Sequence, residues 1–185
     1  MALLTEIEDR LVERVPEIVR GVTLSEPIYA IVIQYFGLDS YGDLSPNLRM
    51  PCLSRREAII SSNSDTAPSL IWDHDEFDDD LAVVDADIGD STLTKCCGNW
   101  YASLKSGTTN LTSFREMVQR ASKRLNQLDW HSISNVTDDF VVYPGDMSHD
   151  FCDPIGDMQA SIPDTRMAGF RERRLLGTDP WWQVK

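Results

Sequence analysis

Residues 28–36, with the sequence IYAIVIQYF, decide the fold. β-Branched and aromatic residues occupy both alternating faces of this stretch, which predicts a strand that is buried on both sides. The run is the longest apolar stretch of the chain, but it contains Gln34 and is about half as long as a bilayer-spanning helix requires. We therefore expect a central strand and no membrane span.

The segment before this strand shows a helical pattern. Apolar residues recur every three or four positions up to Gly21, a residue typical of helix ends. Thr5 and Glu8 have the spacing of a capping box, and Pro16 is expected to break or kink the last turn. The sequence therefore predicts an N-terminal helix with the apolar stripe Leu4, Ile7, Leu11, Val15 and Ile18.

Two further helices are predicted in the second half of the chain. Residues 112–130 form an amphipathic pattern, and Ser113 with Glu116 has the spacing of a second capping box. The pattern of residues 163–176 predicts a shorter helix that has a proline in its first turn and ends at Gly177. The apolar face of the 112–130 helix comprises Phe114, Met117, Val118, Ala121, Leu125 and Leu128.

Short strands are predicted at residues 81–84 and 139–143, so helices and strands are interleaved. This order predicts an α+β (or α/β) fold with a central mixed or antiparallel sheet. An N-terminal helix, a long amphipathic helix near 112–130 and a short C-terminal helix would flank the sheet. We expect one globular domain over residues 1–185, with a flexible acidic loop near 61–80 and a tryptophan-containing tail at 177–185.

The charge of the chain is strongly negative and uneven. Its 185 residues include 30 Asp and Glu but 17 Lys and Arg, which gives a formal charge of -13 and disfavours nucleic-acid binding. Residues 57–94 contain eleven acidic residues and neither Lys nor Arg. Two consequences remain open: basic helices could lie against the acidic loops, or acidic surface could remain free for a basic partner.

The N-terminus and the cysteines bear on the compartment. No apolar stretch of signal-peptide length follows a basic start, since acidic residues begin at Glu6. Four cysteines are too few for a disulfide scaffold, and adjacent cysteines such as Cys96 and Cys97 rarely bond to each other. We expect buried, inert thiols in a cytoplasmic protein.

Several pieces of the chain resemble a bacterial family called domain of unknown function 4303. They are the N-terminal helix, the strand at 29–33, the loop YGDLSPN at 41–47, the stretch WDHDEF at 72–77 and the late strand DFVVY at 139–143. The resemblance implies a cytosolic bacterial protein and brings no established activity. Small acidic families of this type often serve as immunity proteins that neutralise a toxin, which is a fold-level analogy.

The densest group of acidic residues follows Trp72. Its spacing does not fit an EF-hand, because Asp78 and Val84 stand where that calcium loop needs glycine and glutamate. We interpret the group as a surface that steers a cationic partner, with Trp72 or Phe77 supplying buried contact. The predicted partner-binding residues are Trp72, Asp75, Glu76, Phe77, Asp78, Asp79 and Asp80.

An alternative site is a metal centre built from His149, Asp146, Asp150 and His74, which would make the protein a small metal-assisted hydrolase. No two histidines have the spacing of a zinc-protease helix, and no phosphate-binding glycine motif occurs. We therefore expect no catalytic residues, no metal and no cofactor.

Arginines and tryptophans near the C-terminus leave two further interpretations open. Arg166, Arg171, Arg173 and Arg174 could bind an anion, although pairing with the acidic segments is favoured. The Trp181-Trp182 pair could pack onto the domain or anchor an interface, which would make the protein a structural or oligomer-forming subunit. The leading hypothesis remains a non-enzymatic, acidic protein-binding module of the immunity type, directed at a basic toxin or effector.

Overall fold

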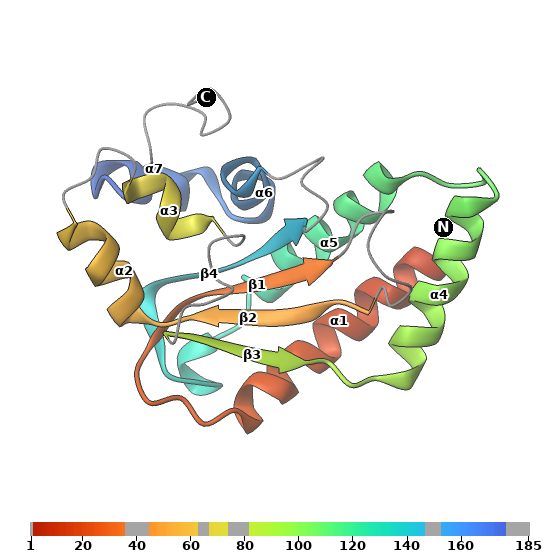
Figure 1. The fold of residues 1–185 in the computed structure, drawn as a ribbon, viewed down its shortest axis with the longest axis horizontal. Coiled ribbons are helices and arrows are strands. Elements are labelled where there is room, and N and C mark those ends of the chain that lie inside the picture. Colours follow the sequence, from red (N-terminus) through yellow and green to blue (C-terminus); the bar gives the residue numbers. More distant parts are fainter. Residues whose placement is uncertain (1, 36–44, 63–66, 74–81, 147–152, 177–185) are drawn as a thin grey trace.

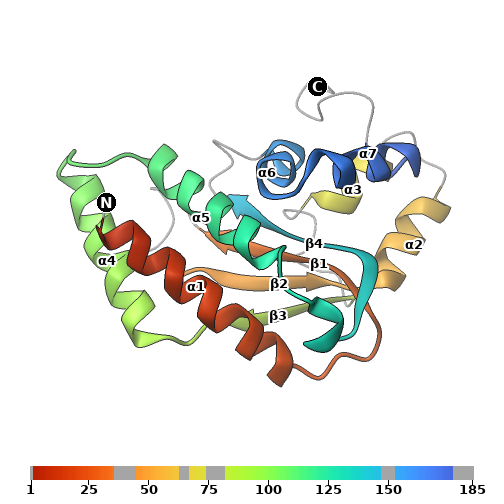
Figure 2. The same cartoon turned by 180° about the vertical axis from the view of Figure 1, so that it is seen from behind.

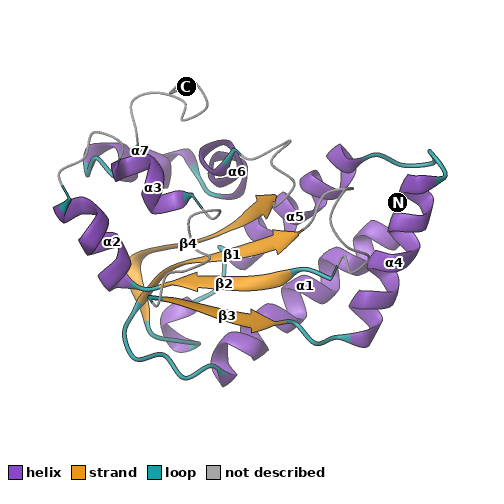
Figure 3. Cartoon of the chain, in the orientation of Figure 1, coloured by secondary structure: helices purple, strands orange, loops and turns teal. Residues whose placement is uncertain are grey.

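A four-stranded mixed sheet forms the middle of the described structure (Figure 1 and Figure 3). The computed structural model describes residues 2–35, 45–62, 67–73, 82–146 and 153–176. The strand order is β3-β2-β1-β4, with β1 antiparallel to β2 and parallel to β4, and with β2 antiparallel to β3. The α+β prediction with a mixed sheet is confirmed. The strands are β1 (Ile28–Tyr35), β2 (Asn47–Pro51), β3 (Val83–Asp87) and β4 (Val136–Asp146).

One face of the sheet is covered by the helices that are in front in Figure 2. Ile31 and Ile33 of β1 and Val142 of β4 point into this layer, where they share a core cluster with Leu11 of α1 and Val118 of α5. The helices of this face are α1 (Ala2–Gly21), α4 (Ser91–Lys105) and α5 (Leu111–Leu125).

The opposite face carries a second core cluster. Tyr29 and Val32 of β1, which alternate with Ile31 and Ile33, pack there with Trp72 and Phe170. Every residue of β1 is buried, which confirms that the strand is covered on both sides. The helices of this face are α2 (Leu53–Ser61), α3 (Ala67–Trp72), α6 (Pro154–Ser161) and α7 (Asp164–Glu172).

Helix α1 corrects two details of the sequence prediction. It begins at Ala2, so Thr5 lies inside the helix and the predicted capping box with Glu8 is wrong. Pro16 also lies inside the helix, which continues to Gly21 as predicted. Burial of Val15 and Val19 on either side of the proline stabilises this last turn, since full burial of each such side chain contributes about 1.5 to 3 kcal/mol. This offsets the cost of about 3 kcal/mol for a proline inside a helix.

The two later helices are shorter than predicted. Asn110 caps α5 by accepting a 2.9 Å hydrogen bond from the Ser113 backbone N–H, so the predicted Ser113–Glu116 capping box is wrong. Helix α5 ends at Leu125, and Leu128 is exposed rather than part of the apolar face. A short 3-10 helix, η2 (Trp130–Ser132), follows. Helix α7 ends at Glu172, and Gly177 lies outside the described residues.

The structure corrects one predicted loop and the bounds of one predicted strand. Helix α3 lies within the predicted acidic loop near 61–80, and β4 runs from Val136 to Asp146 instead of over residues 139–143. Pro144 is tolerated in β4 because this strand is at the edge of the sheet, where a missing N–H costs little. The tryptophan-containing tail at 177–185 lies outside the described residues.

Candidate functional site

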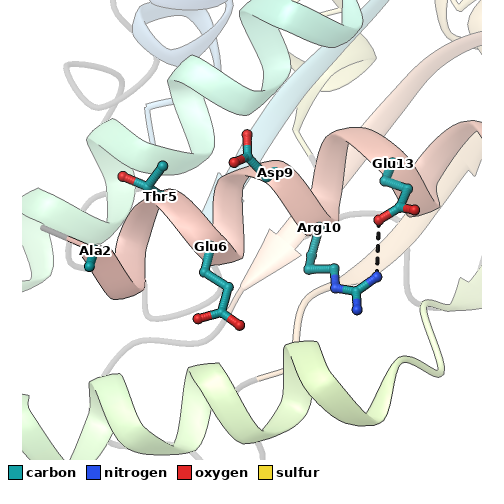
Figure 4. A pocket seen from close by; sticks show the side chains of 6 residues that line it. All are labelled: Ala2, Thr5, Glu6, Asp9, Arg10 and Glu13. Atoms are coloured by element: carbon teal, nitrogen blue, oxygen red, sulfur yellow. Dashed lines mark hydrogen bonds and ion pairs between the residues drawn. The ribbon is translucent and has the colours of Figure 1, made fainter.

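The exposed face of α1 carries an acidic hollow of about 480 Å³. The apolar stripe of α1 faces the sheet, so its polar residues at helical spacing face outward. Figure 4 shows Glu6 and Arg10 pointing toward α4, while Thr5 and Asp9 point to the other side of the helix. The hollow is lined by Ala2, Thr5, Glu6, Asp9, Arg10 and Glu13.

Three carboxylates and one guanidinium line this hollow, which makes it negatively charged. Arg10 Nη1 lies 3.0 Å from Glu13 Oε2, and Arg124 Nη1 of α5 lies 2.7 Å from Asp9 Oδ1. Glu6 is exposed and makes no ion pair with Lys or Arg in the described part of the chain. The hollow therefore offers one carboxylate, that of Glu6, without an ion pair to Lys or Arg in the described part of the chain.

Glu6 also affects a neighbouring thiol on α4. Burial raises the pKa of Cys96, and the charge of Glu6 together with its hydrogen bond to the thiol raises it further. Cys52, Cys96 and Cys97 are buried and form no disulfide bond. The predicted inertness of Cys96 has a physical basis, because a raised pKa lowers the fraction of reactive thiolate.

A second set of ion pairs holds α1 against α5. Glu8 accepts hydrogen bonds from Arg120 Nε at 2.9 Å and from Arg124 Nη1 at 3.1 Å. Hydrogen bonds to Asp9 and Glu8 raise the pKa of Arg124. These contacts hold α1, the helix that carries the hollow, against α5 and engage Arg120 and Arg124.

Trp72, the first of the predicted partner-binding residues, is a core residue. Its side chain is fully buried, and its indole Nε1 donates a 2.7 Å hydrogen bond to the Leu175 carbonyl. The Trp72 ring makes edge contacts with Tyr29, Tyr143 and Phe170, with centroids 5.2 to 6.1 Å apart. The prediction that Trp72 contacts a partner is therefore corrected, since this apolar surface is already satisfied within the fold. Asp75, Glu76, Phe77, Asp78, Asp79 and Asp80 lie outside the described residues.

Four described acidic residues of the 57–94 segment, Glu57, Asp85, Asp87 and Asp90, form two groups. Asp85 Oδ1 lies 3.0 Å from Arg49 Nε, and Asp90 Oδ2 lies 3.5 Å from Arg14 Nε. Asp85 and Asp90 therefore pair with basic residues of the same chain, which is one of the two possibilities that the sequence left open. Glu57 and Asp87 are exposed and make no ion pair with a Lys or Arg that the structure describes.

Asp146, a residue of the predicted metal centre, ends β4 opposite Tyr35 at the end of β1. Both side chains are buried at the carboxyl edge of the parallel strand pair, where ligand sites of α/β sheets commonly lie. His74, His149 and Asp150 lie outside the described residues. Within the described ranges, no group of three or more His, Cys, Asp and Glu side chains is placed to hold a metal ion.

A buried carboxylate near this edge has no counterpart among the sequence predictions. Asp157 of α6 accepts 2.8 Å hydrogen bonds from Arg115 Nε and Gln119 Nε2 of α5. Burial raises the pKa of Asp157 despite these donors. Arg115 and Gln119 are four residues apart on one face of α5, and this spacing is the signal in the sequence that could have indicated a buried acceptor.

Sequence reasoning also missed the hollow on α1. The signal was present, because Glu6, Asp9 and Glu13 recur at three and four positions on the polar side of a predicted helix. The same pattern is typical of any solvated helix face, so only the structure distinguishes a concave surface from a flat one.

No family model, curated protein or solved structure matches the chain. The described helices include none that is both long and apolar enough to cross a membrane.

Proposed function

We propose that the protein is a non-enzymatic binding module that engages a basic protein partner, in the manner of an immunity-type inhibitor. The observation that carries this proposal is the acidic hollow on α1, in which the Glu6 carboxylate has no ion pair within the described chain. The charge of a lysine or arginine side chain of a partner is complementary to this hollow.

The distribution of ion pairs supports the same conclusion. The chain has 30 acidic residues for 17 basic ones, so there are too few Lys and Arg side chains to pair with every carboxylate. Several of these cations are already engaged in pairs that hold the helices to each other and to the sheet. Eight arginines make ion pairs within the described chain: Arg10, Arg14, Arg49, Arg56, Arg115, Arg120, Arg124 and Arg173.

The mechanism of binding follows from the exposure of these carboxylates. Exposed charges contribute more to the association rate than to affinity, and their effect weakens as salt is added. The sequence predicts a second acidic surface at residues 75–80, which lie outside the described residues. The three described cysteines form no disulfide bond, which fits the reducing cytoplasm that we propose as the compartment.

An oligoarginine peptide tests the proposal as a defined cationic probe. We expect the double variant Glu6→Gln, Glu13→Gln to bind the peptide several-fold more weakly than the unmodified protein at low salt. The matched control is Glu116→Gln, Glu172→Gln, which removes the same charge from two exposed positions without an ion pair in the described chain. Equal weakening by both double variants would overturn the assignment of the hollow, because net charge alone would then explain binding.

The predicted 75–80 surface is tested separately with Asp78→Asn, Asp79→Asn and Asp80→Asn in one variant. We expect this variant to weaken peptide binding by more than a triple variant of exposed acidic residues elsewhere. If neither acidic surface affects the affinity beyond its matched control, the binding-module proposal fails. Calorimetric titration at two salt concentrations provides the measurement.

A further inference from the structure

A carboxylate on the opposite face of the sheet is surrounded by arginines. Asp139 of β4 points to the side of α2 and α7, because it alternates with Phe140, whose side chain lies in the other core cluster. Asp139 Oδ2 lies 2.8 Å from Arg56 Nη1 of α2 and 2.8 Å from Arg173 Nη1 at the end of α7. One carboxylate oxygen therefore accepts hydrogen bonds from two guanidinium groups.

A third guanidinium belongs to this cluster. Arg166 is half-buried and lies seven residues before Arg173, which puts both side chains on the same face of α7. The charge of Asp139 also acts on Arg166. Burial lowers the pKa of Arg166, and the attraction of Asp139 only partly offsets this effect. Arg166 makes no ion pair with any residue that the structure describes, so the cluster holds three guanidiniums for one carboxylate.

The neighbouring acidic residue of β4 does not neutralise this excess. Asp138 points to the other face of the sheet, where its Oδ1 lies 3.7 Å from His131 Nε2. The local charge of Asp139 with Arg56, Arg166 and Arg173 is therefore positive by two in a chain whose formal charge is -13. The cluster lies on the opposite side of the sheet from the acidic hollow on α1.

Aromatic rings hold two of these arginines in place. The Arg56 guanidinium carbon lies 5.2 Å from the centroid of the Tyr29 ring, and that of Arg173 lies 5.4 Å from the Phe170 ring. Such stacking fixes the plane of a guanidinium, and Arg173 Nε also donates a 3.2 Å hydrogen bond to the Gly169 carbonyl. Because little side-chain freedom is then lost on binding, the donors are preorganised for an anion.

We propose that Arg56, Arg166 and Arg173 form a binding site for a dianionic phosphate group. Phosphate matches the local charge of the cluster, and its tetrahedral oxygens accept paired hydrogen bonds from guanidinium forks. The overall negative charge of the protein repels anions, so phosphate would bind only where the structure concentrates positive charge. This site is independent of the proposed binding of a basic partner.

Equilibrium binding of inorganic phosphate and of phenyl phosphate to the full chain tests this proposal. We expect saturable binding at one site, weakened about tenfold or more by Arg166→Gln, since a hydrogen bond to a charged group contributes about 1.5 to 3 kcal/mol. The matched control is Arg20→Gln, an exposed arginine on the other side of the sheet, which should leave binding unchanged. Asp139→Asn should strengthen binding, because it removes the competing carboxylate.

The outcomes separate the possible sources of phosphate. Tighter binding of phenyl phosphate supports a phosphorylated molecule as the ligand, whereas equal or tighter binding of inorganic phosphate supports free phosphate. Circular dichroism of each variant establishes that it is folded, and Arg173→Gln replaces Arg166→Gln if the latter is not. Absence of saturable binding by the unmodified protein, or equal binding by the Arg166→Gln and Arg20→Gln variants, would overturn the proposal.

Discussion

Asn126 closes the free edge of β4, and its replacement should destabilise the whole fold. Its side-chain Oδ1 accepts a 2.9 Å hydrogen bond from the Val142 backbone N–H, and its Nδ2 donates to the Val142 carbonyl at 2.7 Å. Nδ2 also donates to the carbonyls of Ser122 and Ser161, at 2.9 and 3.2 Å. Within the described sheet β4 pairs only with β1, so the Asn126 amide takes the place of a further strand at this edge.

The magnitude of the effect follows from the groups that would lose their partners. Val142 is fully buried, and an unsatisfied buried backbone group costs about 1 to 3 kcal/mol. We therefore expect Asn126→Ala to lower the free energy of unfolding by about 2 to 4 kcal/mol. Asn126→Asp should cost more, because it removes the donors and places a carboxylate against three carbonyl oxygens.

Urea unfolding monitored by circular dichroism measures this effect. We expect each variant to keep the m-value, the slope of the free energy of unfolding against urea concentration. Asn99 of α4 provides the control, because it is exposed and its side chain makes no hydrogen bond within the described residues. Asn99→Ala should alter stability by less than about 0.5 kcal/mol. If Asn126→Ala and Asn99→Ala had equal effects, the reasoning about the edge of β4 would be refuted.

Three other predictions concern pH, thiol reactivity and a helix end. Burial raises the pKa of Asp139, but hydrogen bonds from Thr137 and Arg56 and the charges of Arg56 and Arg173 hold it below 3.8. The contribution of Asp139 to stability is therefore present above pH 3.8 and lost as the pH falls through the lower folded-state value. Asp139→Asn should cost about 3 kcal/mol at neutral pH and progressively less in acid, whereas a constant difference would contradict this account. A maleimide should not modify Cys96 in the folded protein and should modify it once urea is added, because the thiol is buried and its pKa is raised. Peptide mapping after labelling measures this. Rapid modification without urea would show that burial does not protect Cys96. Arg174 has a left-handed backbone (φ 55°) at the end of α7, where the Leu175 N–H donates to the Phe170 carbonyl. Glycine adopts this conformation without strain, so Arg174→Gly should raise the free energy of unfolding by about 0.5 to 1 kcal/mol. Thermal unfolding measures the change, and a loss of stability would argue against strain at Arg174.

The central strand could be predicted because its signal is local. Residues 28–36 are apolar on both alternating faces, and β1 is buried throughout as that pattern requires. Strand β2 escaped prediction because only Leu48 and Met50 mark its buried face, and Pro51 ends it. Its pairing with β1 and β3 depends on contacts between distant residues, which a local pattern does not show.

Helix α4 escaped prediction for a different reason. Gly98 interrupts the helical pattern within this segment. Asp90 marks its start by accepting a 2.8 Å hydrogen bond from the Leu93 backbone N–H, a signal that acidic surroundings obscured.

The sequence allowed the negative charge of the candidate site to be predicted, but not its location on α1. Composition indicated a protein that attracts cations, but Trp72 was assigned to the surface because its burial depends on Tyr29, Tyr143 and Phe170 from distant segments. The hollow on α1 likewise depends on how α1 lies relative to its neighbours, which no helical spacing shows.

Mapping the contact of the oligoarginine peptide by amide chemical shifts tests the central claim most directly. The account predicts that titration at low salt perturbs the exposed turn of α1 around Glu6, and that added salt reverses the perturbation. Perturbations that leave α1 unchanged, or that persist in high salt, would contradict it.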